Sequence, residues 1–188
     1  MKLTKPIAGI LCFCSFIGYA NLDTLQARDQ KSDISFLSGD NIPDEIKDVE
    51  VPEQLKKQAQ IAATRGIPPS ITIAIAYHET GGFKAIIGEG NYYGIKCVDS
   101  ESDPCTSVKT RESYCTGLCE QSFQVGKNNK FVANVFANTL INLAGLEGQP
   151  KSKIEDEFQD VENILNRIGR RYATDPNWAK KVIAILLK

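Results

Sequence analysis

Residues 67–97, IPPSITIAIAYHETGGFKAIIGEGNYYGIKC, decide the fold. They open with a predicted helix in which residues 71–77 are all apolar or aromatic except for one threonine. A helix without a polar face is expected to be surrounded by protein on all sides. Ser70 is its expected N-cap, and Gly81-Gly82 supply the left-handed residues that end a helix. A short aromatic strand is expected at 93–97, after this glycine break.

Glu79 stands at the end of the predicted helix. The C-terminal end of a helix carries partial negative charge, and burial disfavours an ionised carboxylate, so both effects raise the pKa of Glu79. A glutamic acid that stays protonated near neutral pH is what general acid catalysis requires. The alternative is a surface glutamate in a helix-ending turn, because only some perturbed carboxylates mark a functional site.

Three motifs, in this order, resemble the bacterial glucosaminidase family, glycoside hydrolase family 73, whose members include peptidoglycan hydrolases of the flagellar-rod and autolysin type. They are the apolar helix ending in ETG at 79–81, NYYGIK at 91–96 and YATDPNWAKK at 172–181. Together they cover about 52–188. The resemblance implies a lysozyme-like fold and a glycoside hydrolase that cleaves the β-1,4 bond after N-acetylglucosamine in the glycan strands of peptidoglycan.

Glycoside hydrolysis usually takes two carboxyl groups: one protonates the leaving oxygen, and the other activates water or attacks the sugar. By the resemblance, Glu79 has the first role and Glu112, on a predicted strand, has the second. Tyr172, the tyrosine of the third motif, is the remaining catalytic candidate. Its phenol would hydrogen-bond the N-acetyl group or the attacking water. The alternatives are a solvent-facing strand residue for Glu112 and a core tyrosine for Tyr172.

Four further residues are candidates for sugar contacts. Aromatic faces pack against the apolar faces of pyranose rings, which favours Phe83, Tyr92 and Tyr93, and Asn91 begins the same motif as the two tyrosines. Strand neighbours point to opposite faces, so at least one of these tyrosines is expected in the core. The only histidine, His78, is interpreted as structural, because it points elsewhere on the helix than the neighbouring glutamate.

The helical period fails between 83 and 129, where a small β-hairpin lobe is expected, with strands at 93–97 and 107–114. The cysteines of this lobe are Cys97, Cys105, Cys115 and Cys119. In an exported protein an even number of cysteines in a loop-rich lobe implies disulfides. Of the three pairings, we favour Cys97–Cys105 and Cys115–Cys119, each closing a short loop. Zinc is the rival interpretation, but these spacings do not match the usual paired ligands. No metal or cofactor is expected.

The remaining pattern predicts a mainly α (α+β) architecture. Helices are expected at 52–65 and 131–146, and apolar residues three and four apart predict another across 154–168. Asp175 is the expected N-cap of a last helix that has Pro176 at its first position. The predicted fold is therefore a lysozyme-like helical body with a small disulfide-bearing β-hairpin lobe, and with the cleft between lobe and helices.

The chain has 188 residues, 42% hydrophobic and 24% charged, with a formal net charge of −1. This composition suits one compact domain and gives no reason to expect nucleic acid or an anionic membrane as a partner. Residues 1–20 resemble a secretory signal peptide, although an uncleaved anchor is the alternative. We expect export to the periplasm or beyond, no membrane contact after cleavage, a polar arm at 21–50 and one domain at 51–188.

Two segments depart from the family's pattern. Residues 80–83 read TGGF where the family usually has a Gly-Trp-Gly-like run, and 123–126 read FQVG where it often has Phe-Arg-x-Tyr. Two alternatives therefore stay open: a lytic transglycosylase or muramidase on a similar fold, which needs only one catalytic acid, or a peptidoglycan-binding module without turnover. The sequence leaves open the stereochemical outcome, the oligomeric state, any envelope-machine or inhibitor partner, and whether the role is wall remodelling, machine assembly or attack on rivals.

Overall fold

The computed structural model describes residues 45–46, 49–97, 103–110 and 117–187. The predicted signal peptide at 1–20 and most of the predicted arm at 21–50 lie outside these ranges. At the end of the arm, β1 (Glu45–Ile46) and β2 (Val49–Glu50) form a small antiparallel pair. Within the described ranges, no helix has the length and apolar character needed to cross a membrane.

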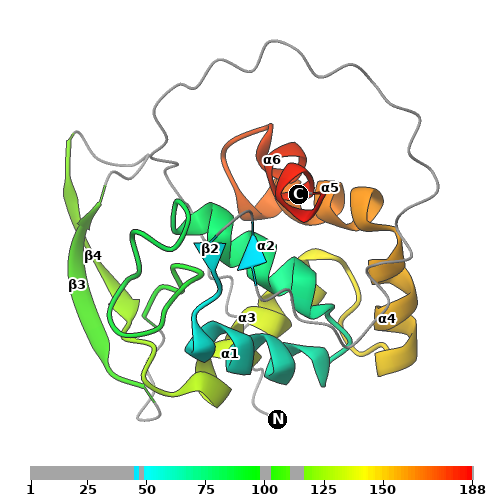
Figure 1. Ribbon diagram of the computed structural model, residues 1–188, viewed down its shortest axis with the longest axis horizontal. Coiled ribbons are helices and arrows are strands. Elements are labelled where there is room, and N and C mark those ends of the chain that lie inside the picture. Colours follow the sequence, from blue (N-terminus) through cyan, green and yellow to red (C-terminus); the bar gives the residue numbers. More distant parts are fainter. Residues whose placement is uncertain (1–44, 47–48, 98–102, 111–116, 188) are drawn as a thin grey trace, which may run out of the picture.

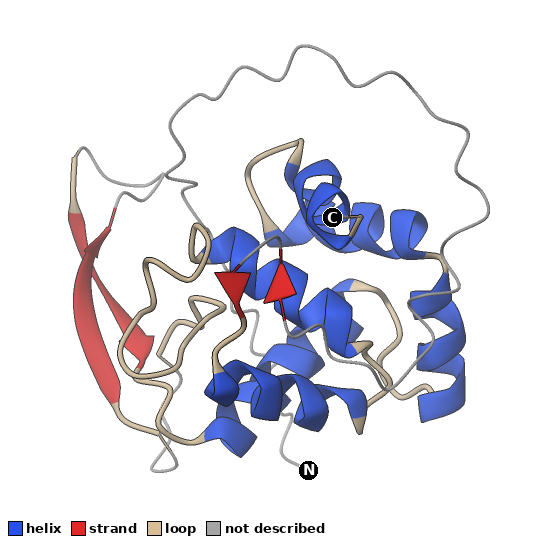
Figure 2. Ribbon diagram, viewed as in Figure 1, coloured by secondary structure: helices blue, strands red, loops and turns tan. Residues whose placement is uncertain are grey.

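Helices make up most of the described chain, and two longer strands form a separate lobe at one side (Figure 2). The helices are α1 (Glu53–Ala63), α2 (Pro69–Glu79), α3 (Asn129–Leu143), α4 (Lys151–Gln159), α5 (Val161–Tyr172) and α6 (Trp178–Leu186). The lobe strands are β3 (Cys105–Thr110) and β4 (Cys119–Gln124). The predicted architecture, a helical body with a small β lobe, is confirmed.

Helix α2 runs through the middle of the body, between α1 on one side and α6 on the other (Figure 1). Every residue of α2 is buried except Tyr77 and Glu79 in its last turn, which keep partial exposure. The prediction of Ser70 as N-cap is wrong, because the helix begins earlier. Pro68 is the N-cap and the rigid φ of Pro69 suits the first helical position, so no side chain caps this end.

The strands β3 and β4 are antiparallel neighbours, paired from Cys105–Gln124 to Thr110–Cys119. The segment before the lobe lies along the other edge of β4: Lys96 bridges Phe123, and the Cys97 N–H donates to the Ser122 carbonyl at 2.9 Å. The strand expected at 93–97 is therefore only one bridge to β4. This segment does not pair with β3, because β4 lies between the two. The sequence CEQSFQ of β4 is mostly polar, which hid this strand from the pattern.

One disulfide of the lobe is described in full. It joins Cys97 to Cys105, whose Cα atoms lie 5.6 Å apart, as predicted. Cys119 is also disulfide-bonded, and Cys115, its expected partner, lies outside the described residues. The Cys97–Cys105 bond ties the segment on one edge of β4 to the beginning of β3 on the other.

The last three helices differ from expectation at their ends. The single helix expected across 154–168 is two helices, because the backbone of Asp160 leaves the helical conformation and its side chain accepts the Asn163 N–H at 3.2 Å, capping α5. Helix α6 begins at Trp178, and its N-cap is Asn177 rather than Asp175. Asp175 instead accepts the Asn177 N–H at 2.9 Å and so holds the turn before the helix.

Candidate active site

Glu79 is the last residue of α2, and the turn that follows it is held by Thr80. The Thr80 hydroxyl donates to the Ala76 carbonyl at 2.6 Å and accepts the Phe83 N–H at 2.9 Å. Gly81 and its successor have φ angles of +58° and +78°, which glycine adopts at no steric cost. The chain therefore turns sharply just after Glu79, and the carboxyl stands at a fixed end of the buried helix.

Trp178, the first residue of α6, contacts this carboxyl directly. Its indole Nε1–H donates to Oε1 of Glu79 at 2.7 Å, and its side chain is 1% exposed. Burial raises the pKa of Glu79 from 4.5 to about 7, and the hydrogen bond from Trp178 opposes that rise. The carboxyl is thus a weak acid that is half protonated near neutral pH, a state suited to proton transfer.

Tyr172, the last residue of α5, lies on the other side of Trp178, with the two ring centroids 5.0 Å apart. It is 1% exposed, and its hydroxyl donates to the Tyr93 carbonyl at 3.4 Å. Burial raises the pKa of Tyr172 well above its ordinary value, and the nearby charge of Glu79 adds to the effect. The structure therefore brings Tyr172 and Glu79 together, and the phenol is neutral wherever the carboxyl titrates.

Sequence reasoning assigned Trp178 only to the packing face of the last helix and missed its contact with Glu79. The contact spans 99 residues, so local periodicity could not reveal it. Two signals were present: Trp178 belongs to the third motif, and it is the only tryptophan in the chain.

His78 is buried against the same indole, with ring centroids 6.4 Å apart and the planes nearly perpendicular. Burial lowers the pKa of His78, and the charge of Lys181 lowers it further, while Asp175 opposes both. Lys181 and Asp175 form an ion pair at 2.7 Å. His78 is thus a packed, mostly neutral side chain in the wall behind the carboxyl.

An aromatic cluster adjoins the end of α2. The Phe83 ring lies edge-to-face with Tyr77 at 5.2 Å and with Tyr92 at 6.4 Å. Phe83 and Tyr77 are partly exposed, whereas Tyr92 is only 3% exposed. Phe83 has φ +62°, a conformation that non-glycine residues adopt only when the surroundings hold it. Of the predicted sugar contacts, Phe83 is the one at the surface beside Glu79.

The other two predicted sugar contacts lie inside the molecule. Tyr93 is fully buried and stacks on Phe136, with ring centroids 3.8 Å apart. Asn91 is 1% exposed, and its amide donates to the Ile95 and Gln124 carbonyls while its oxygen accepts the Ile95 N–H. These side chains hold the core and the turn, and the geometry gives them no surface for a sugar.

Glu112, the predicted second carboxylate, lies outside the described residues, and β3 is described only to Thr110. No charged side chain in the described part contributes to the raised pKa of Glu79. In the same part, no three His, Cys, Asp or Glu side chains are grouped so that they could hold a metal ion. The described site therefore consists of one carboxyl, an indole and a phenol.

A family sequence model described as Glucosaminidase, mannosyl-glycoprotein endo-beta-N-acetylglucosaminidase, matches residues 56–188. The chain belongs to the glucosaminidase family. It is a glycoside hydrolase, as the motifs indicate. No sequence among the curated proteins matches it significantly.

Solved structures share the fold of this glucosaminidase domain. A mutant of the peptidoglycan hydrolase from Sphingomonas sp. A1 has 20% identity over 72% of this chain and 89% of its own, with a TM-score of 0.51. The catalytic domain of the autolysin Auto from Listeria monocytogenes has 16% identity over 74% of this chain and 86% of its own, with a TM-score of 0.52. The glycoside hydrolase domain of Salmonella typhimurium FlgJ has 22% identity over 71% of this chain and 82% of its own, with a TM-score of 0.50. The expected lysozyme-like fold is confirmed.

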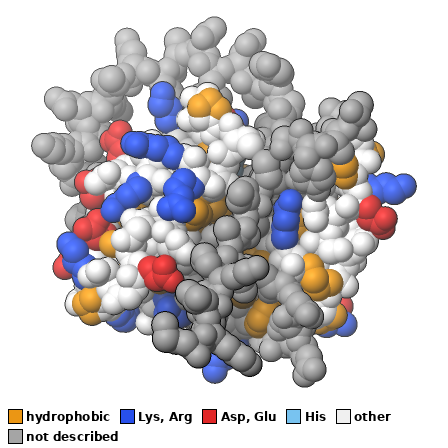
Figure 3. Space-filling view, turned by 180° about the vertical axis from the view of Figure 1, so that it is seen from behind, with side chains coloured by type: hydrophobic (Ala, Val, Ile, Leu, Met, Phe, Trp, Pro, Cys, Tyr) orange, Lys and Arg blue, Asp and Glu red, His pale blue; other side chains and the backbone are white. Residues whose placement is uncertain are grey.

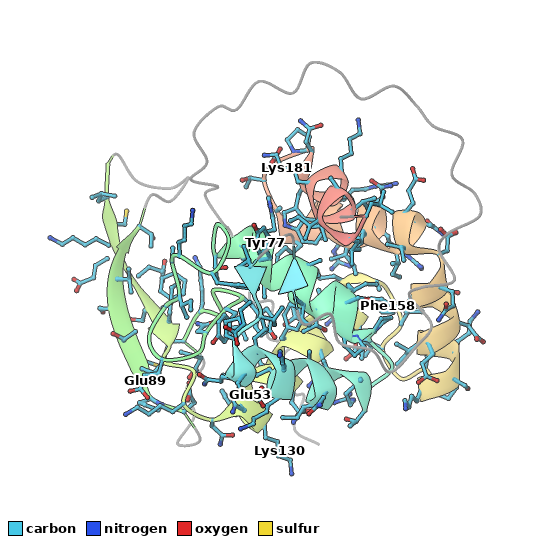
Figure 4. All side chains as sticks on the ribbon, in the orientation of Figure 1. Glu53, Tyr77, Glu89, Lys130, Phe158 and Lys181 are labelled. Carbon is cyan, nitrogen blue, oxygen red and sulfur yellow. A yellow bond between two sulfur atoms is a disulfide. The ribbon has the colours of Figure 1, made fainter. Side chains whose placement is uncertain are left out.

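Two hollows lie away from this site, and neither has a carboxyl among the described residues that line it. One, of about 840 Å³, lies between α1 and the start of α3, where Lys130 lies at the bottom of the view in Figure 4 and Lys181 near the top. The other, of about 300 Å³, is lined by Arg167, Arg170 and Arg171 and by the end of α3.

Figure 3 shows Lys and Arg side chains gathered at the upper left of the back face. No acid of the described part lines either hollow, and Glu79 remains the centre of the candidate site.

Proposed function

We propose that this glucosaminidase-family protein hydrolyses the β-1,4 bond after N-acetylglucosamine in peptidoglycan, with Glu79 as the general acid. The observation that carries the proposal is the Glu79 carboxyl itself, which stands partly exposed at the end of a buried helix with its pKa raised to about 7. Lysozyme provides the same chemical pattern, a glutamic acid that burial keeps protonated for proton donation.

In the proposed reaction, Glu79 gives its proton to the glycosidic oxygen as the bond between that oxygen and the anomeric carbon breaks. Water supplies the hydroxyl that ends on the anomeric carbon, and the proton lost by that water restores Glu79 or passes to a second carboxylate. We propose Glu112 for that carboxylate, acting either as base or as nucleophile. Tyr172, next to Glu79, is proposed to hydrogen-bond the N-acetyl group or the water.

Peptidoglycan is the proposed substrate because the fold neighbours include a protein named peptidoglycan hydrolase and one named autolysin. The partly exposed Phe83 ring, which contacts Tyr77, is proposed to pack against the apolar face of a sugar ring near the acid. We propose that the protein acts outside the cytoplasm, since the Cys97–Cys105 disulfide fits an oxidising compartment and residues 1–20 resemble a signal peptide.

The test is digestion of purified peptidoglycan by the wild type and by Glu79→Gln, with products reduced by borohydride and identified by mass spectrometry. The matched control is Glu89→Gln, which removes an exposed carboxyl that pairs with Lys127. We expect fragments ending in reduced N-acetylglucosamine from the wild type and the control, and none from Glu79→Gln. Anhydro-ended fragments would mean a lytic transglycosylase instead, and glycan binding without any fragment would mean a silent binding module.

The proposed export has a separate test. Expression of the full chain in a Gram-negative host, followed by mass analysis of the periplasmic fraction, should yield a protein that begins at Asn21. A protein retained in the cytoplasm with residues 1–20 intact would contradict the proposed export.

A further inference from the structure

The hydrogen bond between Trp178 and Glu79 has a chemical direction. An indole N–H only donates, so the oxygen that it contacts must act as an acceptor. That oxygen is Oε1, at 2.7 Å from Nε1. A protonated carboxyl has one O–H and one carbonyl oxygen, and the carbonyl oxygen is the better acceptor of the two.

We propose that Trp178 is a positioning residue that confines the acidic proton of Glu79 to Oε2 and prevents the carboxyl from rotating. This inference rests on the proposed function, in which Glu79 is the general acid. When Glu79 is protonated, the indole N–H favours the proton on Oε2, because the carbonyl oxygen of a carboxylic acid is a better acceptor than its hydroxyl oxygen. When Glu79 has given the proton away, the same N–H stabilises the resulting carboxylate.

The indole is itself held from two helices, which a positioning role requires. Gly169 of α5 faces it: a Cβ at that position would lie 2.9 Å from Cε3 of Trp178, so the ring fits only against glycine. Tyr172 packs against the ring from the same helix, and His78 packs edge-to-face from α2. These contacts leave the ring 1% exposed and restrict its rotation, which favours one direction for its N–H.

Other titratable groups around the carboxyl act differently. Tyr172 from α5 is neutral, because burial raises its pKa well above the ordinary value. His78 from α2 has a lowered pKa, and Lys181 from α6 is paired with Asp175 from the preceding turn. A titration near pH 7 sensed at the indole is therefore assigned to Glu79, and Glu79→Gln tests the assignment.

The single tryptophan makes the bond directly observable. In the ¹H–¹⁵N spectrum of the wild-type protein the one indole N–H signal reports Trp178 alone. We expect the chemical shift of this signal to change with pH with an apparent pKa of about 7, which is the raised pKa of Glu79. In Glu79→Gln we expect the signal not to change across this pH range. A signal that titrates identically in both proteins, or in neither, would overturn the inference.

The functional test replaces the single tryptophan by benzothienylalanine, which keeps the approximate shape of the indole but has sulfur in place of N–H. The matched control is the protein made by the same incorporation procedure with ordinary tryptophan. With benzothienylalanine we expect kcat to fall roughly 10-fold or more, KM to change little, and the alkaline limb of the kcat profile to move up by about one pH unit. The control protein with ordinary tryptophan should show the wild-type profile.

Gly169→Ala provides a second route, because its methyl group would push the indole away from the carboxyl. We expect it to reproduce the benzothienylalanine profile if it folds. Unchanged kcat and an unchanged alkaline limb with benzothienylalanine would mean that Trp178 only packs, and would overturn the proposal. An inactive wild type whose indole signal still titrates with Glu79 would contradict the proposed function while supporting the positioning of the proton.

Discussion

The indole Nε1 of Trp178 lies 2.7 Å from Oε1 of Glu79, although 99 residues separate the two in the chain. The bond joins the C-terminal end of α2 to the N-terminal end of α6, and Tyr172 packs against the same indole from α5. Three helices thus meet at one carboxyl. The pKa of Glu79 is raised because the carboxyl is buried where these helices meet, since burial is the largest cause of the shift.

Stability should depend on pH through Glu79. Burial raises its pKa from 4.5 to about 7, so the folded protein holds a proton that the unfolded chain releases between these values. This stabilisation is fully present below pH 4.5 and is lost as the pH rises through 7. Glu79→Gln lacks this dependence, so its free energy of unfolding relative to wild type should rise across that window by roughly 1–3 kcal/mol.

Urea unfolding of both proteins across that pH window, at fixed ionic strength, measures this difference. If the difference in unfolding free energy between mutant and wild type does not vary with pH, the pKa of Glu79 is not raised by folding. The proposal that Glu79 is protonated near neutral pH and acts as a general acid would then be contradicted.

Tyr172→Phe should reduce activity far more than stability. Its hydroxyl donates to the Tyr93 carbonyl over a long distance, 3.4 Å, so the loss of that hydrogen bond should cost about 1 kcal/mol or less. We expect kcat/KM on soluble glycan fragments to fall roughly 10²-fold, as when one hydrogen-bond donor is removed from a reaction centre.

The matched comparison is Tyr93→Phe. The Tyr93 hydroxyl is buried and has no hydrogen-bond partner among the described residues, so its loss should leave activity intact and stabilise the fold by about 1 kcal/mol. Equal kinetic effects of the two variants would remove Tyr172 from the catalytic site.

Phe83 should matter for substrate binding. Because its φ is +62°, Phe83→Gly removes the ring without backbone strain, whereas Phe83→Ala keeps the strain. For Phe83→Gly we expect a KM increase of about 5-fold, the worth of one aromatic contact, with a smaller change in kcat. Initial rates over a range of glycan concentrations measure both constants, and a fall in kcat alone would argue against a sugar contact.

The Cys97–Cys105 disulfide should stabilise the β lobe. The two cysteines are eight positions apart, so the loop is short, and the chain-entropy account predicts a loss of about 2–3 kcal/mol in the Cys97→Ser, Cys105→Ser double variant. Amide exchange should accelerate in β3 and β4 before it does in α2. Uniform acceleration throughout the helices would show that the lobe and the body unfold together.

The sequence predicted the parts of the site that local patterns encode. The apolar run of α2 has no polar face, which indicated a buried helix, and the glycines after it placed Glu79 at its end. The same reasoning could not find Trp178, whose partner lies on another helix. It also merged α4 with α5, because their apolar stripe continues across Asp160 while only the backbone departs from the helix.

The predicted sugar contacts divide in the same way. Phe83 follows the helix end closely and lies beside the acid, whereas Asn91 and Tyr93 are drawn inward by contacts with β4 and Phe136. Those contacts come from residues more than thirty positions later. The polar composition of β4 gave little sign that this strand would bury Asn91.

The most direct measurement is digestion of peptidoglycan in H₂¹⁸O by the wild type and by Glu79→Gln, with mass analysis of the new chain ends. Hydrolysis with Glu79 as general acid predicts one ¹⁸O atom on each new N-acetylglucosamine end, formed by the wild type and absent with Glu79→Gln. New ends without ¹⁸O, or labelled ends formed equally fast by Glu79→Gln, would contradict the account.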